Sequence, residues 1–181
     1  YLPFKQDYTV EGFSTVTYKG NGGTQYIGGT GFQPDLTWIK KRDGADNHAL
    51  FNSLVSTSNY LRSDTTQDER TNGAFSFETD GFKLTSGDGS WNASNTYVAW
   101  NWDMGGSNAS NTDGSITSTV RANATYGQSI VSWTGTGANA TVGHGLSSAP
   151  ELIILKNRDE SQNWGVFHKD LNDGTNADVL R

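Results

Sequence analysis

An internal repeat constrains the fold of this chain more than any other feature. The stretch GFQPDLTWIKKRDGADNHALFNSL, which begins at Gly31, recurs as GLSSAPELIILKNRDESQNWGVFHKDL from Gly145. The matched positions lie 116 residues apart, and they pair Pro34 with Pro150, Asp35 with Glu151, Leu36 with Leu152, Trp38 with Ile154, Lys40 with Lys156, Arg42 with Arg158, Asn47 with Asn163 and Phe51 with Phe167. Further upstream, STVTYKGNGG at Ser14 matches SIVSWTGTGA at Ser129, at a spacing of 115. A repeat of this length indicates two copies of one structural unit.

The repeated stretch predicts a β-hairpin. In DLTWIK, alternation places Leu36 and Trp38 on one face and Thr37 and Ile39 on the other, after a proline that is typical of a strand start. The polar loop KRDGADN follows, and HALFNSL returns as a short strand. The matching ELIILK is apolar on both faces, which predicts cover by a second sheet, and a β-sandwich supplies such cover.

Other segments also read as strands. They are FSTVTY from Phe13, AFSFETDGFKL with a hairpin turn at Asp80-Gly81, and NTYVAWNWD. In the last of these, Trp100 and Trp102 share a face, and we predict that both rings lie in the core. The polar stretch NSLVSTSNYLRSDTTQDERTNG, residues 52–73, has no sustained helical pattern and predicts a long surface loop.

The repeat sets the expected domain organisation. We predict a connecting segment over residues 1–12, a first β-sandwich repeat over 13–106, a linker rich in Gly, Ser, Asn and Thr over 107–126, and the N-terminal half of a second sandwich over 127–181. The fold class is therefore all-β, with antiparallel sandwiches in tandem and the second copy incomplete. An incomplete sandwich leaves apolar faces and strand edges uncovered, so we expect the chain to belong to a longer, assembled protein.

Composition excludes several partners. The net charge is −6 and the pI is about 4.9, so the chain offers no basic stripe for nucleic acid and no polybasic patch for anionic lipid. No apolar run approaches the length of a membrane span, so we predict no membrane insertion. The chain has no cysteine, which excludes disulfides and thiolate metal sites.

Few residues have the spacing of a catalytic or metal site. Sandwich glycosidases use a Glu-x-Asp-x-x-Glu strand, whereas Glu78-Thr79-Asp80 is followed by Lys83 in the third position, so a solvated turn is the favoured interpretation and no catalytic residue is predicted. Asp88, Ser90 and Asn92 alternate as oxygen ligands do, but an EF-hand would need glycine and glutamate where the chain has alanines. A polar turn is favoured there, and a weak oxygen-ligand calcium site stays open. The three histidines lack zinc spacing, and no cofactor is predicted.

Two tryptophans in polar loops are candidates for ligand binding. Trp91 lies in a loop of Ser, Asn and Gly, and Trp164 lies where the first copy has His48. Aromatic rings beside amide side chains suit sugar binding, so the ligand-binding candidates are Trp91, Asn92, His48, Asn47, Trp164 and Asn163. The alternative is that these rings fold back onto the sandwich.

The combined motifs resemble a known family. GFQPDLTWIKKRDGADNHALFNSL, TNGAFSFETDGFKL and TYVAWNWD, with the stretch from GSITSTV to ELIILKNR, are similar to a repeat domain of tailed-phage virion-appendage or tail-fibre-like proteins, common in marine phages and cyanophages. In that family the YVAW strand often continues with cysteine where this chain has Asn101, a difference that concerns packing.

The resemblance implies a sandwich of jelly-roll or lectin-like type and a non-enzymatic virion structural protein at the virion surface or tail. The implied partners are other virion proteins, copies of the chain itself as a homo-oligomer, and a host-surface glycan. Two alternatives stay open: a polysaccharide-degrading enzyme of the tailspike type and a bacterial cell-surface adhesin.

Overall fold

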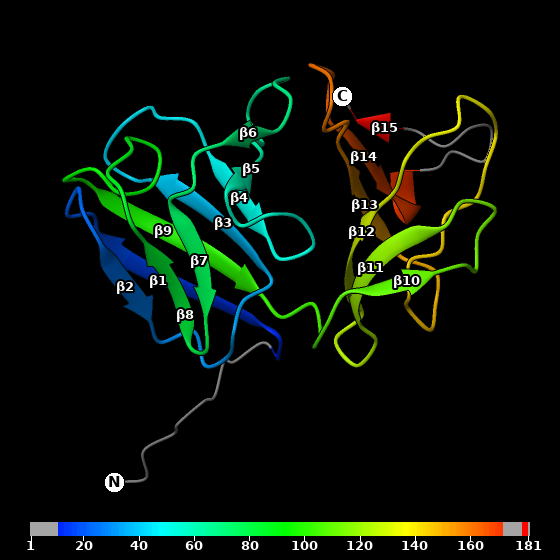
Figure 1. The fold of residues 1–181 in the computed structure, drawn as a ribbon, viewed down its shortest axis with the longest axis horizontal. Helices are drawn as coiled ribbons and strands as arrows, with labels where there is room; N and C mark the ends of the chain where they lie inside the picture. The colour runs from blue at the N-terminus through cyan, green and yellow to red at the C-terminus, as the bar shows by residue number, and fades with distance from the viewer. Residues whose placement is uncertain (1–10, 172–178, 181) are drawn as a thin grey trace, which may run out of the picture.

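The computed structural model describes residues 11–171, 179 and 180, which form an all-β chain with antiparallel sheets (Figure 1). The predicted all-β, antiparallel class is confirmed. Within the described residues, helical structure is limited to the 3-10 turn η1 (Lys169–Leu171). The strands in chain order are β1 (Phe13–Lys19), β2 (Gln25–Gly28), β3 (Leu36–Lys41), β4 (Ala49–Asn52), β5 (Asn59–Tyr60), β6 (Arg70–Thr71), β7 (Phe75–Glu78), β8 (Gly81–Leu84), β9 (Thr96–Trp102), β10 (Ala109–Asn111), β11 (Ser118–Asn123), β12 (Gln128–Ser132), β13 (Leu152–Leu155), β14 (Gly165–His168) and β15 (Val179–Leu180).

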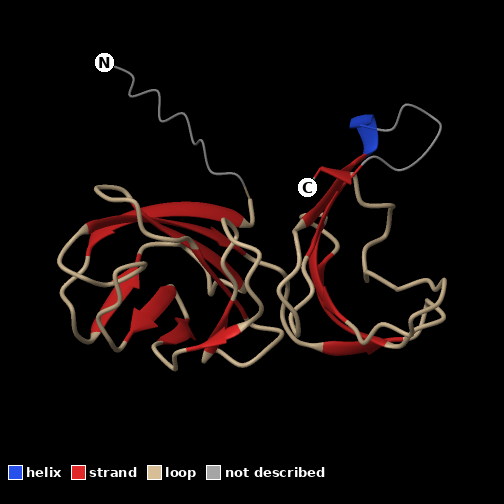
Figure 2. Cartoon of the chain, turned by 90° about the horizontal axis from the view of Figure 1, so that it is seen from above, coloured by secondary structure: helices blue, strands red, loops and turns tan. Residues whose placement is uncertain are grey.

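Residues 11–104, here called the N-terminal unit, form a β-sandwich. A four-stranded sheet in the order β1-β9-β3-β4 faces a three-stranded sheet in the order β2-β8-β7 (Figure 2). The core joins the two sheets, since Phe51 of β4 stacks on Phe75 of β7 with ring centroids 4.1 Å apart. Phe75 in turn stacks on Phe82 of β8 at 5.3 Å. Aromatic pairs of this kind add to the stabilisation that comes from buried apolar area.

Strand β9 lies at the centre of its sheet, but with the opposite face inward from the one predicted. Tyr97, Ala99 and Asn101 are fully buried, whereas Trp100 and Trp102 are half-buried on the outer face of the sheet. The prediction that both tryptophans lie in the core is wrong. The polar Asn101 is tolerated inside because the Thr37 hydroxyl donates to its side-chain oxygen at 2.9 Å and its amide donates to the Ala99 carbonyl.

Residues 105–171, 179 and 180, here called the C-terminal unit, hold two three-stranded sheets, β10-β11-β12 and β13-β14-β15. Strands β10 and β11 lie in the segment for which the sequence predicts a linker, and they pair with β12. In the stretch from residue 54 to 73, the predicted surface loop carries only the short strands β5 and β6, which pair with each other.

The hairpin β13–β14 repeats the hairpin β3–β4 residue by residue. Leu36 pairs with Asn52 in the first hairpin, and Leu152 pairs with His168 in the second, so both partners are shifted by 116 residues. The loops agree as well. The Lys40 ammonium group donates to the carbonyls of residues 41 and 44, and that of Lys156 donates to those of residues 157 and 160.

Candidate functional site

The outer face of the four-stranded sheet carries a cluster of aromatic side chains. Because side chains alternate along a strand, Trp38 of β3 and Trp100 and Trp102 of β9 point away from the core. The Trp38 and Trp100 rings meet edge to face with centroids 5.6 Å apart, and Phe13 packs on Trp102 at 5.1 Å. We call Trp38, Trp100 and Trp102 the outer tryptophans.

His48 extends this face at the end of the hairpin loop. The Trp38 indole N–H donates to His48 Nδ1 at 2.8 Å, which requires an unprotonated nitrogen. Partial burial lowers the pKa of His48 below its ordinary value of 6.5, while the nearby Asp64 carboxylate acts in the opposite direction. The imidazole is therefore neutral at pH 7 and holds the Trp38 ring in place.

A cleft of about 810 Å³ lies between the outer face of the four-stranded sheet, where Trp38 and Trp102 line it, and the C-terminal unit. Its first wall comes from the N-terminal unit, and its second wall comes from β12, β13 and the residues around them. Most of the side chains that line it are apolar, and they include Leu36, Trp38, Leu50, Leu54, Val55, Leu61, Trp102, Met104, Ile130, Val131, Trp133, Leu146, Leu152, Ile154, Leu155 and Trp164. A concave, mostly apolar site with a few polar groups is the usual form of a ligand or partner site.

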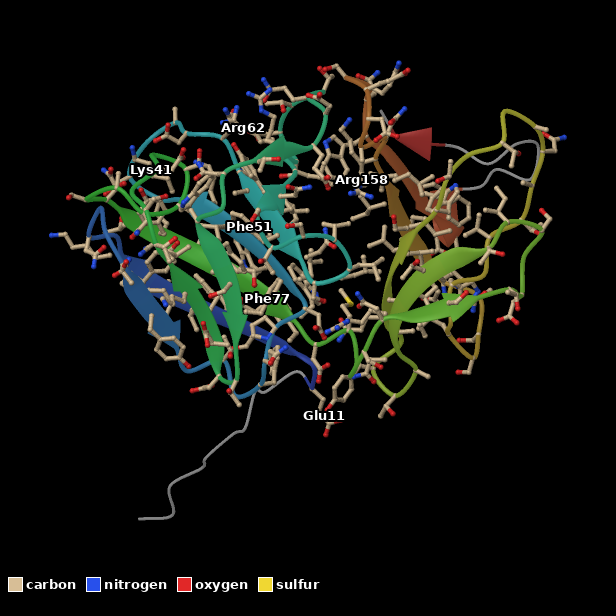
Figure 3. The ribbon with its side chains drawn as sticks, viewed as in Figure 1. Glu11, Lys41, Phe51, Arg62, Phe77 and Arg158 are labelled. Atoms are coloured by element: carbon tan, nitrogen blue, oxygen red, sulfur yellow. The ribbon has the colours of Figure 1, made fainter. Side chains whose placement is uncertain are left out.

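Ion pairs and hydrogen bonds hold the two walls together. Arg158, at the boundary between the units (Figure 3), makes a two-pronged pair with the Glu69 carboxylate, with both N–O distances at 2.8 Å. This pair raises the pKa of Arg158. A second pair links the units, since the Arg121 guanidinium donates to the buried carboxylate of Asp35. These contacts orient the cleft, because charge-assisted bidentate pairs fix geometry as well as contribute energy.

Three of the predicted ligand-binding residues contact the segment of residues 62–65, and one of them, Trp164, lines the cleft. The Trp164 indole N–H donates to the carbonyls of Arg62 and Thr65 at 3.0 and 3.1 Å. In the same loop, Asp64 accepts a hydrogen bond from the His48 backbone N–H, and the Asn47 amide lies against the Arg62 and Asp64 side chains. Asn163, next to Trp164, is exposed.

The other two candidates lie in the core. Trp91 is fully buried between the rings of Phe51 and Tyr60, at 5.6 and 5.0 Å. For Trp91 the alternative interpretation is confirmed, in which the ring folds back onto the sandwich, because its loop covers the end of the sandwich and inserts the ring. Asn92 is also fully buried, and its side-chain amide donates to the carbonyls of Gly23 and Ser86. Neither side chain is accessible to a ligand.

The oxygen-rich positions considered for chemistry are engaged in turns. The Asp88 carboxylate accepts the Ser90 N–H at 2.8 Å, and the Glu78 carboxylate accepts the Ser76 hydroxyl at 2.9 Å. The Asp80 carboxylate accepts the N–H groups of Gly29 and Gly31, which lowers its pKa. In the part of the chain that the structure describes, no group of three His, Asp or Glu side chains is placed to hold a metal ion.

Strand β13 is the part of the site that the sequence interpretation missed. Its apolar character on both faces predicts a covered strand, yet Leu152 and Ile154 are each 54% exposed and Leu155 is 41% exposed. In the matching strand β3, Thr37 and Ile39 are fully buried. The run ELIILK is itself the signal, since an apolar strand at a sheet edge marks an interaction surface as well as a core.

Fold and site together define an all-β protein of two clasped units with an apolar cleft between them and an uncovered strand beside it. Among the described residues, no helix has the length and apolar character needed to cross a membrane. The chain belongs to the family described as a domain of unknown function (DUF7483), whose model matches residues 9–180 and so spans both units. Neither the comparison with curated proteins nor that with solved structures gave a significant match.

Proposed function

We propose that this chain is a non-catalytic structural module of a tailed-phage virion appendage, built from repeated β units, that binds other virion proteins or a host-surface glycan. The observation that carries the proposal is the pair of hairpins with one register and one set of loop contacts. Repetition of a β unit along one chain is typical of proteins that build extended assemblies.

The contacts between the units support an assembly role. The Arg158–Glu69 and Arg121–Asp35 pairs, together with the Trp164 hydrogen bonds, set one orientation between the sheets. A module whose units hold a fixed angle can transmit its position to the next module, whereas units on a flexible tether cannot.

The outer tryptophans support the glycan arm of the proposal. They combine aromatic faces with nearby His48, whose Nδ1 accepts the Trp38 indole N–H and whose other ring nitrogen can donate to a polar ligand. The test is a glycan array probed with the wild-type chain and with Trp100→Ala. Binding should be lost in this variant and kept in Tyr26→Ala, which changes an exposed ring of β2 that does not line the cleft. Equal binding by both variants would move the glycan site away from the outer tryptophans.

Location is tested by antibody labelling. Antibodies against the chain should label an appendage on phage particles purified from the source culture. Labelling confined to bacterial cell envelopes would contradict the virion assignment and favour an adhesin. Release of reducing sugar from host capsule or lipopolysaccharide would contradict the non-catalytic assignment, since it would require a carboxylate pair at work.

A further inference from the structure

Among the described residues, no strand pairs with the edge of β13 that faces away from β14, here called the free edge. The Lys169 N–H donates to the Glu151 carbonyl, and the register pairs Ile153 with Phe167 and Leu155 with Gly165. In an antiparallel ladder, alternate residues direct their N–H and C=O groups to opposite sides. The backbone groups of Leu152 and Ile154 therefore point away from β14, and β13 is the last strand of its sheet among the described residues.

The N-terminal unit shows what occupies the same edge. There the Ser53 N–H donates to the Asp35 carbonyl, so Leu36 and Trp38 direct their backbone groups away from β4, and β9 pairs with them. Strand β9 also pairs with β1, and the sequence counterpart of β1 is β12. Strand β12, like β13, is the last strand of its described sheet. The matched edges thus flank the position that β9 fills in the N-terminal unit.

The side chains of β13 and β14 are also incompletely covered. Every described side chain of β13 and β14 is half-buried or exposed, whereas β3 and β4 each bury alternate residues completely. Proteins normally protect apolar edge strands with charges, prolines or bulges. Glu151 and Lys156 flank β13, and both are engaged, Glu151 with Lys169 and Lys156 with backbone carbonyls of the hairpin loop.

We propose that the free edge of β13 accepts an extended strand from a partner polypeptide, antiparallel to β13 and with the side-chain pattern of β9. In the N-terminal unit Trp102 lies opposite Leu36 and Trp100 lies opposite Trp38. The partner strand places aromatic residues opposite Leu152 and Ile154 by the same register. Because Leu152 and Ile154 line the cleft between the units, those aromatic side chains enter the cleft and fill it.

The partner strand is not β9 of a second copy. Strand β9 is the central strand of its own sandwich, with Tyr97, Ala99 and Asn101 fully buried, and its removal would open the core that it completes. The inference goes beyond the proposed function, since an edge that accepts a strand would serve any assembled protein. The test of the inference uses no virion, so the inference and the proposed function can fail independently of each other.

The test is a binding titration with a synthetic peptide. A fluorescent peptide with the sequence of residues 95–103, NTYVAWNWD, should bind the full chain saturably in an anisotropy assay. A scrambled peptide of the same composition should not bind. A third peptide, with alanine at the positions of Trp100 and Trp102, should bind at least about tenfold more weakly because it cannot fill the cleft. Equal binding by all three peptides would overturn the proposal.

Matched substitutions test the edge itself. Ile154→Pro removes an N–H from the free edge, so peptide affinity should fall at least about tenfold, whereas Ile154→Val keeps that N–H and should change affinity by less than about threefold. Amide exchange of the wild-type chain gives an answer that needs no variant. Exchange at Leu152 and Ile154 should slow on peptide binding, while Ile153, which faces β14, should be protected with or without peptide.

Two further results would overturn the inference. One is unchanged exchange at Leu152 and Ile154 in saturating peptide. The other is protection of these two amides in the free chain that grows with protein concentration and that peptide cannot displace, since a second copy would then occupy the edge.

Discussion

Trp91 and Trp100 lie in the same unit but in opposite environments. Trp91 is fully buried among aromatic rings, whereas Trp100 lies half-buried on the outer face. Trp91→Ala should lower the free energy of unfolding by about 3–5 kcal/mol, the range for deleting a core aromatic side chain. Trp100→Ala should cost about 1–2 kcal/mol, because only part of its area leaves water on folding. Urea unfolding followed by circular dichroism measures both, and equal losses would contradict the assignment of faces.

Asp35 and Glu151 are matched positions with different surroundings. Asp35 is 2% exposed and accepts from Arg121, the Ser53 hydroxyl and the Met104 N–H, while Glu151 pairs with Lys169 at the surface. Arg121→Ala should destabilise the fold by about 3–5 kcal/mol, since it leaves a buried carboxylate without its cation. Lys169→Ala is the control and should leave the melting temperature nearly unchanged. A similar loss in both variants would show that Arg121 acts through something other than burial of its partner.

The Asp80 carboxylate makes stability depend on pH. The N–H groups of Gly31 and Gly29 hold the pKa of Asp80 below its ordinary value of 3.8. A depressed folded-state pKa contributes stability above the unfolded value, and this contribution is lost as the pH falls through the folded value. Asp80→Asn should therefore lose stability relative to the wild type at pH 7, and the difference should shrink as the pH drops below 3.8. Melting curves across that range check the sign, and a constant difference would contradict it.

At the scale of elements, the sequence predicts where the strands lie along the chain. It does not predict which face of each strand turns toward the core. Alternation and the repeat located β3, β4, β9, β13 and β14, because period-two patterns and prolines report local geometry. Which face of β9 turns inward depends on Thr37, a residue 64 positions away that satisfies the buried Asn101. Likewise, Trp91 inserts into the core only because its loop can reach rings on β4 and β5. Contacts of this kind are set by the tertiary fold, so a single strand or loop does not reveal them.

Gly105 and Gly106 are adjacent, but the backbone conformation requires glycine only at the first of them. Gly105, just after β9, has φ of +95°, and a Cβ there would lie 2.5 Å from the Ala122 carbonyl oxygen. A Cβ on Gly106 meets nothing within 4 Å. Gly105→Ala should cost about 1–3 kcal/mol through backbone strain, while Gly106→Ala should be neutral or slightly stabilising. Thermal melts of the two variants decide this, and equal melting temperatures would show that the turn relaxes freely.

For the whole molecule, two hairpins with one register but unequal cover predict unequal stability. The Thr37 N–H lies in the β3–β4 ladder inside a closed sandwich, and the Ile153 N–H lies at the matching point of the β13–β14 ladder. Opening a region costs less when it buries fewer apolar contacts. Amide exchange at Ile153 should therefore be at least about tenfold faster than at Thr37 after correction for intrinsic rates. Equal protection would show that the two units unfold as one.

The position of Asp35 has a mechanical consequence. Its carboxylate binds the Met104 N–H at the exit from β9, the Ser53 hydroxyl after β4 and the Arg121 side chain of β11. A pulling force on the chain between the two units would therefore act first on the contacts of the Asp35 carboxylate. Only after these contacts broke could the force separate β9 from the neighbouring strands. When the chain is stretched between the units, a single buried carboxylate would help to keep the sandwich closed.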